Sequence, residues 1–366
     1  MRKIFKQLHI WLSIPLGLVI ATTCFSGAML IFEKEITAIA QRDLLYVEPK
    51  GNTPLSVDVV AQSVEPHLDP GVTITGVTIF ADPERSYKVN LSEPKHAAIY
   101  VNQYSGEVLG PHERLAFFQY MFRLHRWLMD TRPEDGSIYW GKMIVGTSTL
   151  MMVIILITGA ILWIPKSRKA LRNRLQISLS NGRRRFMHDL HVAGGIYATL
   201  LLLVMALTGL TWSFEWYNKG VHTALGIEYK AKEHNHGKAN SKNPRNPSYE
   251  GWQIAYENVR STTADATEYT ISKRGVSVKS DTYGNQRASD RYSFDKAGAI
   301  TKVVKYEDSE PQSKLRGWLF SLHVGSWGGI TTRIMWLLAS LIGATLPLTG
   351  YYLWFKRKFS ANNAKK

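Results

Sequence analysis

The sequence is poor in the residues that covalent cross-links and many cofactor sites require. Only one of its 366 residues is a cysteine, Cys24, and it lies within an apolar stretch. A disulfide framework is therefore excluded. The chain also lacks a Gly-x-Gly-x-x-Gly segment, which argues against a dinucleotide-binding unit of its own.

Acidic residues are absent from three short stretches that carry the whole positive surplus. Lysine and arginine number 45 against 29 aspartates and glutamates, a formal net charge of +16. The surplus lies in Arg2, Lys3 and Lys6, in eight basic residues between Lys166 and Arg185, and in five after Phe355. A solvated basic face would be mixed with acids, so this segregation argues against a nucleic-acid binder and points to a cause that acts on single loops.

Charged residues are also missing from four runs of 22 or 23 residues. Because a helix rises about 1.5 Å per residue, each run is long enough to cross a hydrocarbon core of about 30 Å. Basic residues close to the ends of spans are retained in the cytoplasm, so both termini and the loop 166–187 are predicted to be cytoplasmic. The two long segments then lie outside. The four runs are Trp11–Phe32, Met143–Pro165, Val192–Phe214 and Ile334–Phe355.

The two halves of the chain repeat the same order of motifs. In span one, Ser26-Gly27 follows eighteen residues after His9, and in span three Thr208-Gly209 follows eighteen residues after His191. Leu-His pairs at 124–125 and 322–323 likewise precede the second and fourth spans. Two parallel repeats place a residue and its counterpart at the same depth on opposite sides of an axis.

Four histidines at matching positions are the chemical signal of the sequence. His9 and His191 open the first and third spans, while His125 and His323 lie in lead-in helices before the second and fourth. Taken singly, each is more often a hydrogen-bonded structural residue, but two facing imidazoles suit the axial positions of a haem iron. Zinc would need further Cys or carboxylate ligands. Without a Cys-x-x-Cys-His motif, the haem would be of the non-covalent b type.

Several other residues enter this hypothesis as alternatives or helpers. His188 lies three residues before His191 on the same helical face, so either residue is a candidate ligand of the inner iron. Arg123 and Arg126 flank His125 and are candidates for pairing with haem propionates. Four histidines without counterparts, His67, His96, His112 and His222, are expected at the surface. His234 and His236 fall in a polar stretch that indicates an exposed loop.

The outer segments each indicate a small α+β module. The first has helix-like spacing over 56–68 and strand candidates at 72–80, 87–91 and 97–101. The second repeats this order with a helix near 251–261 and strands near 267–272, 275–280, 290–294 and 299–304.

The combination of motifs resembles the PepSY-associated transmembrane proteins. The motifs are Ile99-Tyr-Val-Asn-Gln-Tyr-Ser-Gly-Glu-Val-Leu-Gly110, Leu-His-Arg-Trp-Leu at 124–128, Ile-Thr-Gly-Ala-Ile-Leu-Trp at 157–163 and the Leu-His pairs of spans one and three. Within that family the chain is similar to bacterial inner-membrane ferric-siderophore reductases of the FoxB type. This resemblance implies two b haems, a periplasmic position for the PepSY-like outer modules, and iron chelates as substrates.

The expected architecture is a four-helix transmembrane bundle built from two parallel repeats, with two small α+β periplasmic modules. Its expected parts are transmembrane helix 1 (1–32), periplasmic module 1 with its lead-in helix (33–139), transmembrane helix 2 (140–165), a basic cytoplasmic loop (166–187), transmembrane helix 3 (188–214), periplasmic module 2 with its lead-in helix (215–329), transmembrane helix 4 (330–355) and a cytoplasmic tail (356–366).

The sequence therefore favours a haem-dependent oxidoreductase that passes electrons across the inner membrane to a ferric siderophore, with its metal ligands at His9, His191, His125 and His323. The electron donor is expected to be a separate cytoplasmic protein or a quinol, because no dinucleotide-binding motif is present. Two alternatives stay open: a non-enzymatic envelope sensor of the PepSY type, and a siderophore or haem permease. The absence of charged residues within the spans speaks against the permease.

Overall fold

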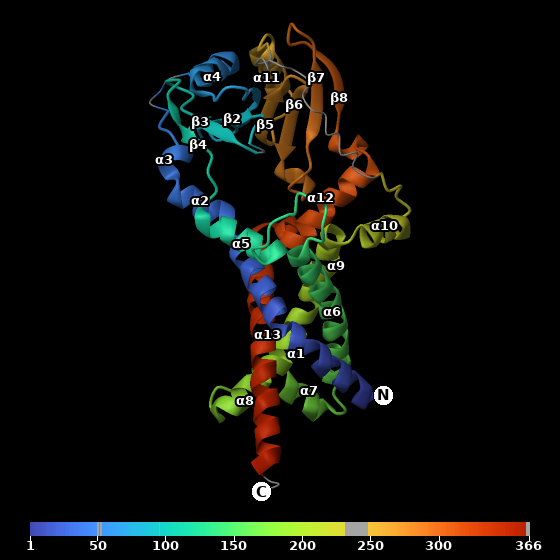
Figure 1. Cartoon of the computed structure of the whole chain (residues 1–366). Coiled ribbons are helices and arrows are strands. Elements are labelled where there is room, and N and C mark those ends of the chain that lie inside the picture. The colour runs from blue at the N-terminus through green and yellow to red at the C-terminus, as the bar shows by residue number, and fades with distance from the viewer. Residues whose placement is uncertain (50, 52, 95, 231–247, 364–366) are drawn as a thin grey trace. The chain divides into compact units, whose positions relative to one another are not determined.

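The computed structural model describes residues 1–49, 51, 53–94, 96–230 and 248–363, so His234 and His236 lie outside the described residues. The chain forms two compact units, shown in Figure 1. The helical unit comprises Met1–Glu33, Ala116–Tyr229 and Leu319–Lys366. The sheet unit comprises Lys34–Leu115 and Lys230–Trp318.

Four helices of the helical unit are long and apolar enough to cross a membrane. Helix α1 packs against α6 and α13, and α9 packs against the same two helices, so the four close into a bundle. A π-helical turn, Leu190–Gly194, joins α8 to α9 and contains His191. The long helices are α1 (Arg2–Leu30), α6 (Trp140–Trp163), α9 (Gly195–Ser213) and α13 (Gly329–Asn363).

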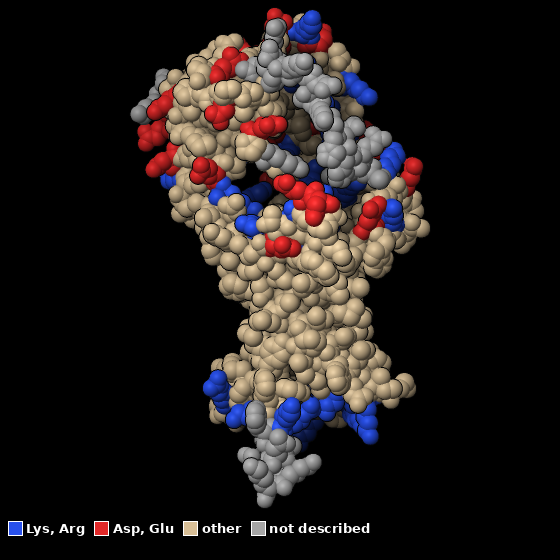
Figure 2. Space-filling model, viewed as in Figure 1, with Lys and Arg blue, Asp and Glu red and all other residues tan. Residues whose placement is uncertain are grey.

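Shorter helices complete the helical unit at both ends of the bundle. On the face shown in Figure 2, no charged side chain lies on the middle of the bundle, whereas lysines and arginines gather at the end where the N-terminus, α7, α8 and the last turns of α13 lie. At that end Arg174 donates to the carbonyls of Leu162 and Trp163, and Arg2 donates to Ile164, so the last turn of α6 has partners for its free carbonyls. The short helices are α5 (Ala116–Trp127), α7 (Arg168–Arg174), α8 (Gly182–Asp189), α10 (Glu215–Ala224) and α12 (Pro311–Val324), whose last residues belong to this unit.

The sheet unit is built on one antiparallel sheet of eight strands in the order β4-β3-β2-β1-β5-β6-β7-β8. The two strand sets expected from the sequence thus pair edge to edge, with Val77 of β1 opposite Ile271 of β5. The short strand β4, with its Gly-Pro end, was missed by sequence periodicity. The strands are β1 (Ile74–Phe80), β2 (Tyr87–Leu91), β3 (Ala98–Val101), β4 (Val108–Pro111), β5 (Ala266–Ser272), β6 (Gly275–Ser280), β7 (Asp290–Phe294) and β8 (Ile300–Val304).

Helices α4 (Val57–Val64) and α11 (Trp252–Ser261) bury one face of this sheet. Val60 of α4 and Val259 of α11 are fully buried, as are Val77 and Val89 of the strands. The side chain of Gln253 accepts a hydrogen bond from the backbone N–H of Val57 at 2.9 Å and so ties α11 to the start of α4. Two further short helices, α2 (Glu33–Ala40) and α3 (Arg42–Leu45), precede the first strand set.

The expectation that His222 lies at the surface is wrong. The imidazole is fully buried: its Nδ1 donates to the carbonyl of Asn218 at 2.8 Å, and its ring meets the edge of Tyr229 at 5.2 Å. Its position on α10, whose chain folds back on itself after Leu225, gives no local sequence signal of burial. His67 and His96 are exposed and His112 is partly exposed.

Candidate functional site

The helical unit brings the four matching histidines together as two pairs. The ring centres of His9 and His191 are 6.4 Å apart, and those of His125 and His323 are 6.1 Å apart. A metal–imidazole bond is about 2.0 Å long, so two rings that bind one metal from opposite sides have centres about 6 Å apart. Both pairs therefore have the spacing of a bis-imidazole site.

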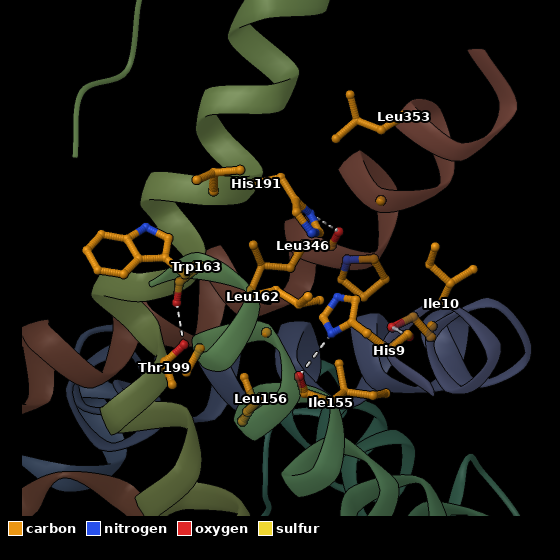
Figure 3. A pocket seen from close by; sticks show the side chains of 18 of the residues that line it. His9, Ile10, Ile155, Leu156, Leu162, Trp163, His191, Thr199, Leu346 and Leu353 are labelled. Carbon is orange, nitrogen blue, oxygen red and sulfur yellow. Dashed lines mark hydrogen bonds between the residues drawn. The ribbon is translucent and has the colours of Figure 1, made fainter. Parts of the chain in front are cut away.

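The inner pair is held by the second and fourth long helices. Nδ1 of His9 lies 3.1 Å from the carbonyl oxygen of Ile155 and 3.2 Å from Oγ1 of Thr158 on α6. Nδ1 of His191 lies 3.1 Å from the carbonyl oxygen of Leu346 and 3.0 Å from Oγ1 of Thr349 on α13. Figure 3 shows both rings in the same cavity, each joined to its carbonyl.

The outer pair repeats this arrangement on the first and third long helices. Nδ1 of His323 lies 2.9 Å from the carbonyl oxygen of Met205 and 3.1 Å from Oγ1 of Thr208 on α9. Nδ1 of His125 lies 2.9 Å from the carbonyl oxygen of Thr23 on α1. In all four cases the carbonyl belongs to the residue four positions before a glycine.

These hydrogen bonds fix the chemistry of each ring. A carbonyl oxygen accepts but never donates, so Nδ1 must carry the proton and Nε2 keeps the lone pair. A metal-binding histidine is oriented by the same kind of bond. Burial lowers the pKa of both outer histidines, and with the charge of its partner it lowers that of His323 to about 4. Both rings are therefore neutral at physiological pH.

The four glycines seat the rings. A Cβ atom at Gly27 would lie 2.8 Å from Cε1 of His125, and one at Gly209 would lie 3.1 Å from Cε1 of His323. At Gly159 the distance to Cε1 of His9 is 3.2 Å, and at Gly350 the distance to Cε1 of His191 is 3.4 Å. The glycines thus let each ring lie against the neighbouring helix, where its Nδ1 reaches the carbonyl.

A family model for the PepSY-associated TM region matches residues 6–357, nearly the whole chain. The chain belongs to the PepSY-associated transmembrane family. No curated protein matches it in sequence. With four helices that are long and apolar enough to span a bilayer, this family member is a multi-pass membrane protein.

The inner histidine pair of this PepSY-associated protein lines a cavity of about 480 Å³. Cofactor pockets measure about 300 to 1,000 Å³ and are mostly apolar. Apolar side chains form the deeper wall, among them Ile20, Leu156 and Leu202. The cavity and its two imidazoles fit the donor set and the apolar surroundings of a b haem. Among the described residues, no group of three or more His, Cys, Asp or Glu side chains is arranged to hold a bare metal ion.

His188 and His191 have different surroundings. His191 faces His9, whereas His188 has a half-exposed side chain whose Nδ1 lies 3.1 Å from Oδ1 of Asp189. Both histidines line the cavity. The geometry therefore places His191, and not His188, opposite His9.

The two arginines beside the outer pair contact nearby parts of their own segment of the chain. Arg123 donates to the carbonyl of Met129 at 3.0 Å. Arg126 lies over the rings of Trp127 and Phe122, at 5.0 and 5.4 Å, and makes no ion pair with a described carboxylate. Arg126 thus has an unpaired charge close to His125, while the guanidinium of Arg123 holds the turn after α5.

Sequence reasoning did not identify the groups that contact the histidine rings of the two pairs. The carbonyl and threonine partners were visible only as Thr-Gly and Ser-Gly dipeptides, which marked the repeat but gave no sign of contact with histidine. Trp212, whose ring lies 5.2 Å from that of His323, had no signal at all. Ser26 takes the place of the threonine in the fourth case, and its hydroxyl donates to the carbonyl of Thr22 at 2.7 Å.

Proposed function

We propose that this PepSY-associated protein is a haem-dependent oxidoreductase of the bacterial inner membrane that reduces ferric siderophores in the periplasm. The observation that carries the proposal is the presence of two partly buried histidine pairs with ring centres 6.4 and 6.1 Å apart in one bundle. In this proposal His9 and His191 hold one b haem, and His125 and His323 hold a second. The bound haems would supply one-electron redox chemistry.

The protein's own residues orient and insulate the two pairs. Each Nδ1–H is fixed by a carbonyl, which holds the ring in place and leaves the lone pair of Nε2 free, so that a haem iron would bind there with little further loss of side-chain entropy. The carbonyl bonds of the partly buried outer rings keep the proton on Nδ1, which leaves the Nε2 lone pairs free for a metal. Apolar residues around the inner pair exclude water and so lower the local dielectric constant.

The two pairs lie at two levels of the bundle. Helix α1 carries His9 of the inner pair and, eighteen residues later, Gly27, which seats His125 of the outer pair. At about 1.5 Å per residue, these two positions are about 27 Å apart along the helix. This separation is close to the thickness of a hydrocarbon core, so one pair would serve each face of the membrane.

The charge pattern supports a cytoplasmic position for the inner pair. The N-terminus, α7, α8 and the last turns of α13 lie at the same end of the bundle, where the basic residues gather (Figures 1 and 2). Such residues are retained on the cytoplasmic side. We infer further that the two halves arose by duplication, because all four histidines contact the carbonyl four residues before a glycine.

The proposed substrate follows from the redox chemistry of iron. One electron converts Fe(III) in a chelate to Fe(II), which oxygen donors hold less strongly, so the metal is released. This step needs no general base or nucleophile. The electrons must come from a separate donor, a quinol or a cytoplasmic reductant.

The proposal is tested by purifying the wild type and single His→Ala variants and measuring haem content by absorption and electron-resonance spectra. We expect two haems in the wild type and one in each variant of His9, His191, His125 and His323. His188→Ala and the exposed-residue control His67→Ala should keep both. Because one loss already breaks a pair, a double variant within a pair should lose no more than a single one.

The same preparations distinguish the alternatives. In vesicles, a ferrous-iron chelator should trap Fe(II) from a ferric hydroxamate only when a reductant is supplied to the other side. A folded but colourless wild type would favour the sensor. Uptake of the intact chelate without reductant would favour the permease.

A further inference from the structure

The lining of the inner cavity has an uneven charge. It includes the side chains of Lys6, Arg174 and Arg357 and the three histidines already described, but no aspartate or glutamate. The cations come from three different elements, α1, α7 and α13. A set of cations that converges from separate helices on one cavity, without a neutralising carboxylate in its wall, is suited to an anionic ligand.

The carboxylate of Asp189, next to His188 in the chain, is already paired. Asp189 is 3% exposed, and its carboxylate accepts from Nε of Arg185 at 2.7 Å, from the backbone N–H of Ser178 at 3.3 Å and from Nδ1 of His188 at 3.1 Å. Asp189 thus orients the imidazole of His188, which lines the cavity. Lys6 and Arg357 make no ion pair with any described residue.

A further donor lies in the same wall. The indole N–H of Trp163 is buried and has no hydrogen-bond partner among the described residues. A buried N–H without a partner is costly, and a ligand that accepts from it removes that cost. Arg174 already donates to the carbonyl of Trp163, so the two side chains lie at the same end of α6.

The two ends of the cavity differ in character. Lys6, Arg174, His188 and Arg357 belong to the basic end of the bundle, whereas the wall further into the bundle is apolar, with Ile20, Met152, Leu156 and Leu202. The cavity therefore suits a ligand with an apolar body and an anionic edge that faces the basic end.

We propose that Lys6, His188 and Arg357 form an anion-binding mouth on the inner cavity, and that they bind the propionate carboxylates of the haem held by His9 and His191. This inference rests on the proposed function. It assigns His188 to the carboxylate end of the haem as a positioning residue and leaves the iron to His191. It also fixes the orientation of the bound haem in the cavity, with the propionate carboxylates toward the basic end of the bundle.

The experiment compares haem with its neutral dimethyl ester. Both are titrated into haem-free protein in a neutral detergent, in the full chain and in a His125→Ala background where only the inner pair is complete. Retention is followed by transfer to apomyoglobin. We expect the inner site to lose the ester about tenfold faster than haem, because charge-assisted bonds at a partly exposed mouth are lost.

Charge variants locate the effect. The Lys6→Gln/Arg357→Gln protein should release haem about fivefold faster than the wild type and release the ester at an unchanged rate. His188→Gln should keep the inner haem but shift its reduction potential, whereas His191→Ala should lose it. The control Lys3→Gln/Lys356→Gln removes one exposed charge from each of the same two helices and should behave as the wild type.

The outcomes separate the two proposals. A wild type that takes up no haem overturns the proposed function and this inference with it. Equal retention of haem and ester, or equal effects of the mouth and control variants, overturns this inference alone. The Lys6→Gln/Arg357→Gln and His188→Gln variants could instead change ligand release only when phosphatidylglycerol is added, and to the same extent for haem and its dimethyl ester. In that case the mouth binds a lipid phosphate, and the assignment to the propionates is wrong.

Discussion

The glycine seats allow a graded test of how the histidines are held. Carbon atoms in contact lie about 3.5 to 4.0 Å apart, so an added Cβ that is 2.8 Å from the ring must displace the ring by about 0.7 Å. By the same comparison Gly27→Ala should displace its ring most and Gly350→Ala least, since the Cβ distances are 2.8 and 3.4 Å. The displacement weakens the Nδ1–carbonyl bond, which is 2.9 Å long for His125.

Gly27→Ala and Gly350→Ala are expected to change the stability of the protein in opposite directions. Overpacking a helix contact costs about 1 to 3 kcal/mol, while replacing a helical glycine with alanine stabilises by about 1 kcal/mol. Gly27→Ala should therefore destabilise the protein by up to about 2 kcal/mol, and Gly350→Ala should be neutral or slightly stabilising. Haem retention should fall in the order Gly350→Ala, Gly159→Ala, Gly209→Ala, Gly27→Ala.

The assay is haem content per protein together with the thermal midpoint in detergent. Gly220→Ala in α10 is the control, because a Cβ atom there would meet no atom within 4 Å. Equal haem content in all five variants, or the reverse order, would refute the idea that the glycines position the rings.

Two further predictions concern the sheet unit. Gly76→Val should lower the free energy of unfolding by about 3 kcal/mol or more, because the added Cβ would lie 2.4 Å from the carbonyl oxygen of Ile271 across the β1–β5 pairing. Thermal unfolding of this variant is compared with that of Thr75→Val, a substitution at the neighbouring exposed position. Equal thermal midpoints for the two variants would contradict the prediction. Burial raises the pKa of Asp290, but bonds from Lys305 and neighbouring donors outweigh this and lower it. The ionised carboxylate of Asp290 therefore stabilises the fold at pH values above about 4, and this stabilisation is lost as the pH falls through the folded-state pKa of Asp290. The difference in thermal midpoint between the wild type and Asp290→Asn should accordingly shrink on acidification. A difference that stays constant with pH would contradict the lowered pKa of Asp290.

The membrane spans and the histidine positions could be predicted because each has a local signal. A charge-free run of 22 residues is typical of a membrane span wherever it occurs. His9 and His191 stand out because each lies eighteen residues before the glycine of a Ser-Gly or Thr-Gly pair, and His125 and His323 because each follows a leucine ahead of a span that contains a Thr-Gly pair. The strands of both outer segments, except β4, were found for the same reason, through alternation within a few residues.

The remaining features depend on contacts between distant segments. The pairing of β1 with β5 joins residues nearly 200 positions apart, and alternation within a strand does not name its neighbour. The anion-binding mouth likewise gathers Lys6, His188 and Arg357 from three separate helices. In the sequence Lys6 and Arg357 were only basic residues near a span, and His188 stood out only as a candidate iron ligand. His222 is buried by a fold-back of its own loop, which polarity does not reveal.

The junction of β1 and β5 has a consequence for how the protein can be divided. Each of these strands has a neighbour on both sides, so the free edges of the sheet are β4 and β8. A fragment ending after the second long helix would expose the bare backbone of β1, and the complementary fragment would expose that of β5. Uncovered strands of this kind pair with other chains, so severed halves would either find each other or aggregate.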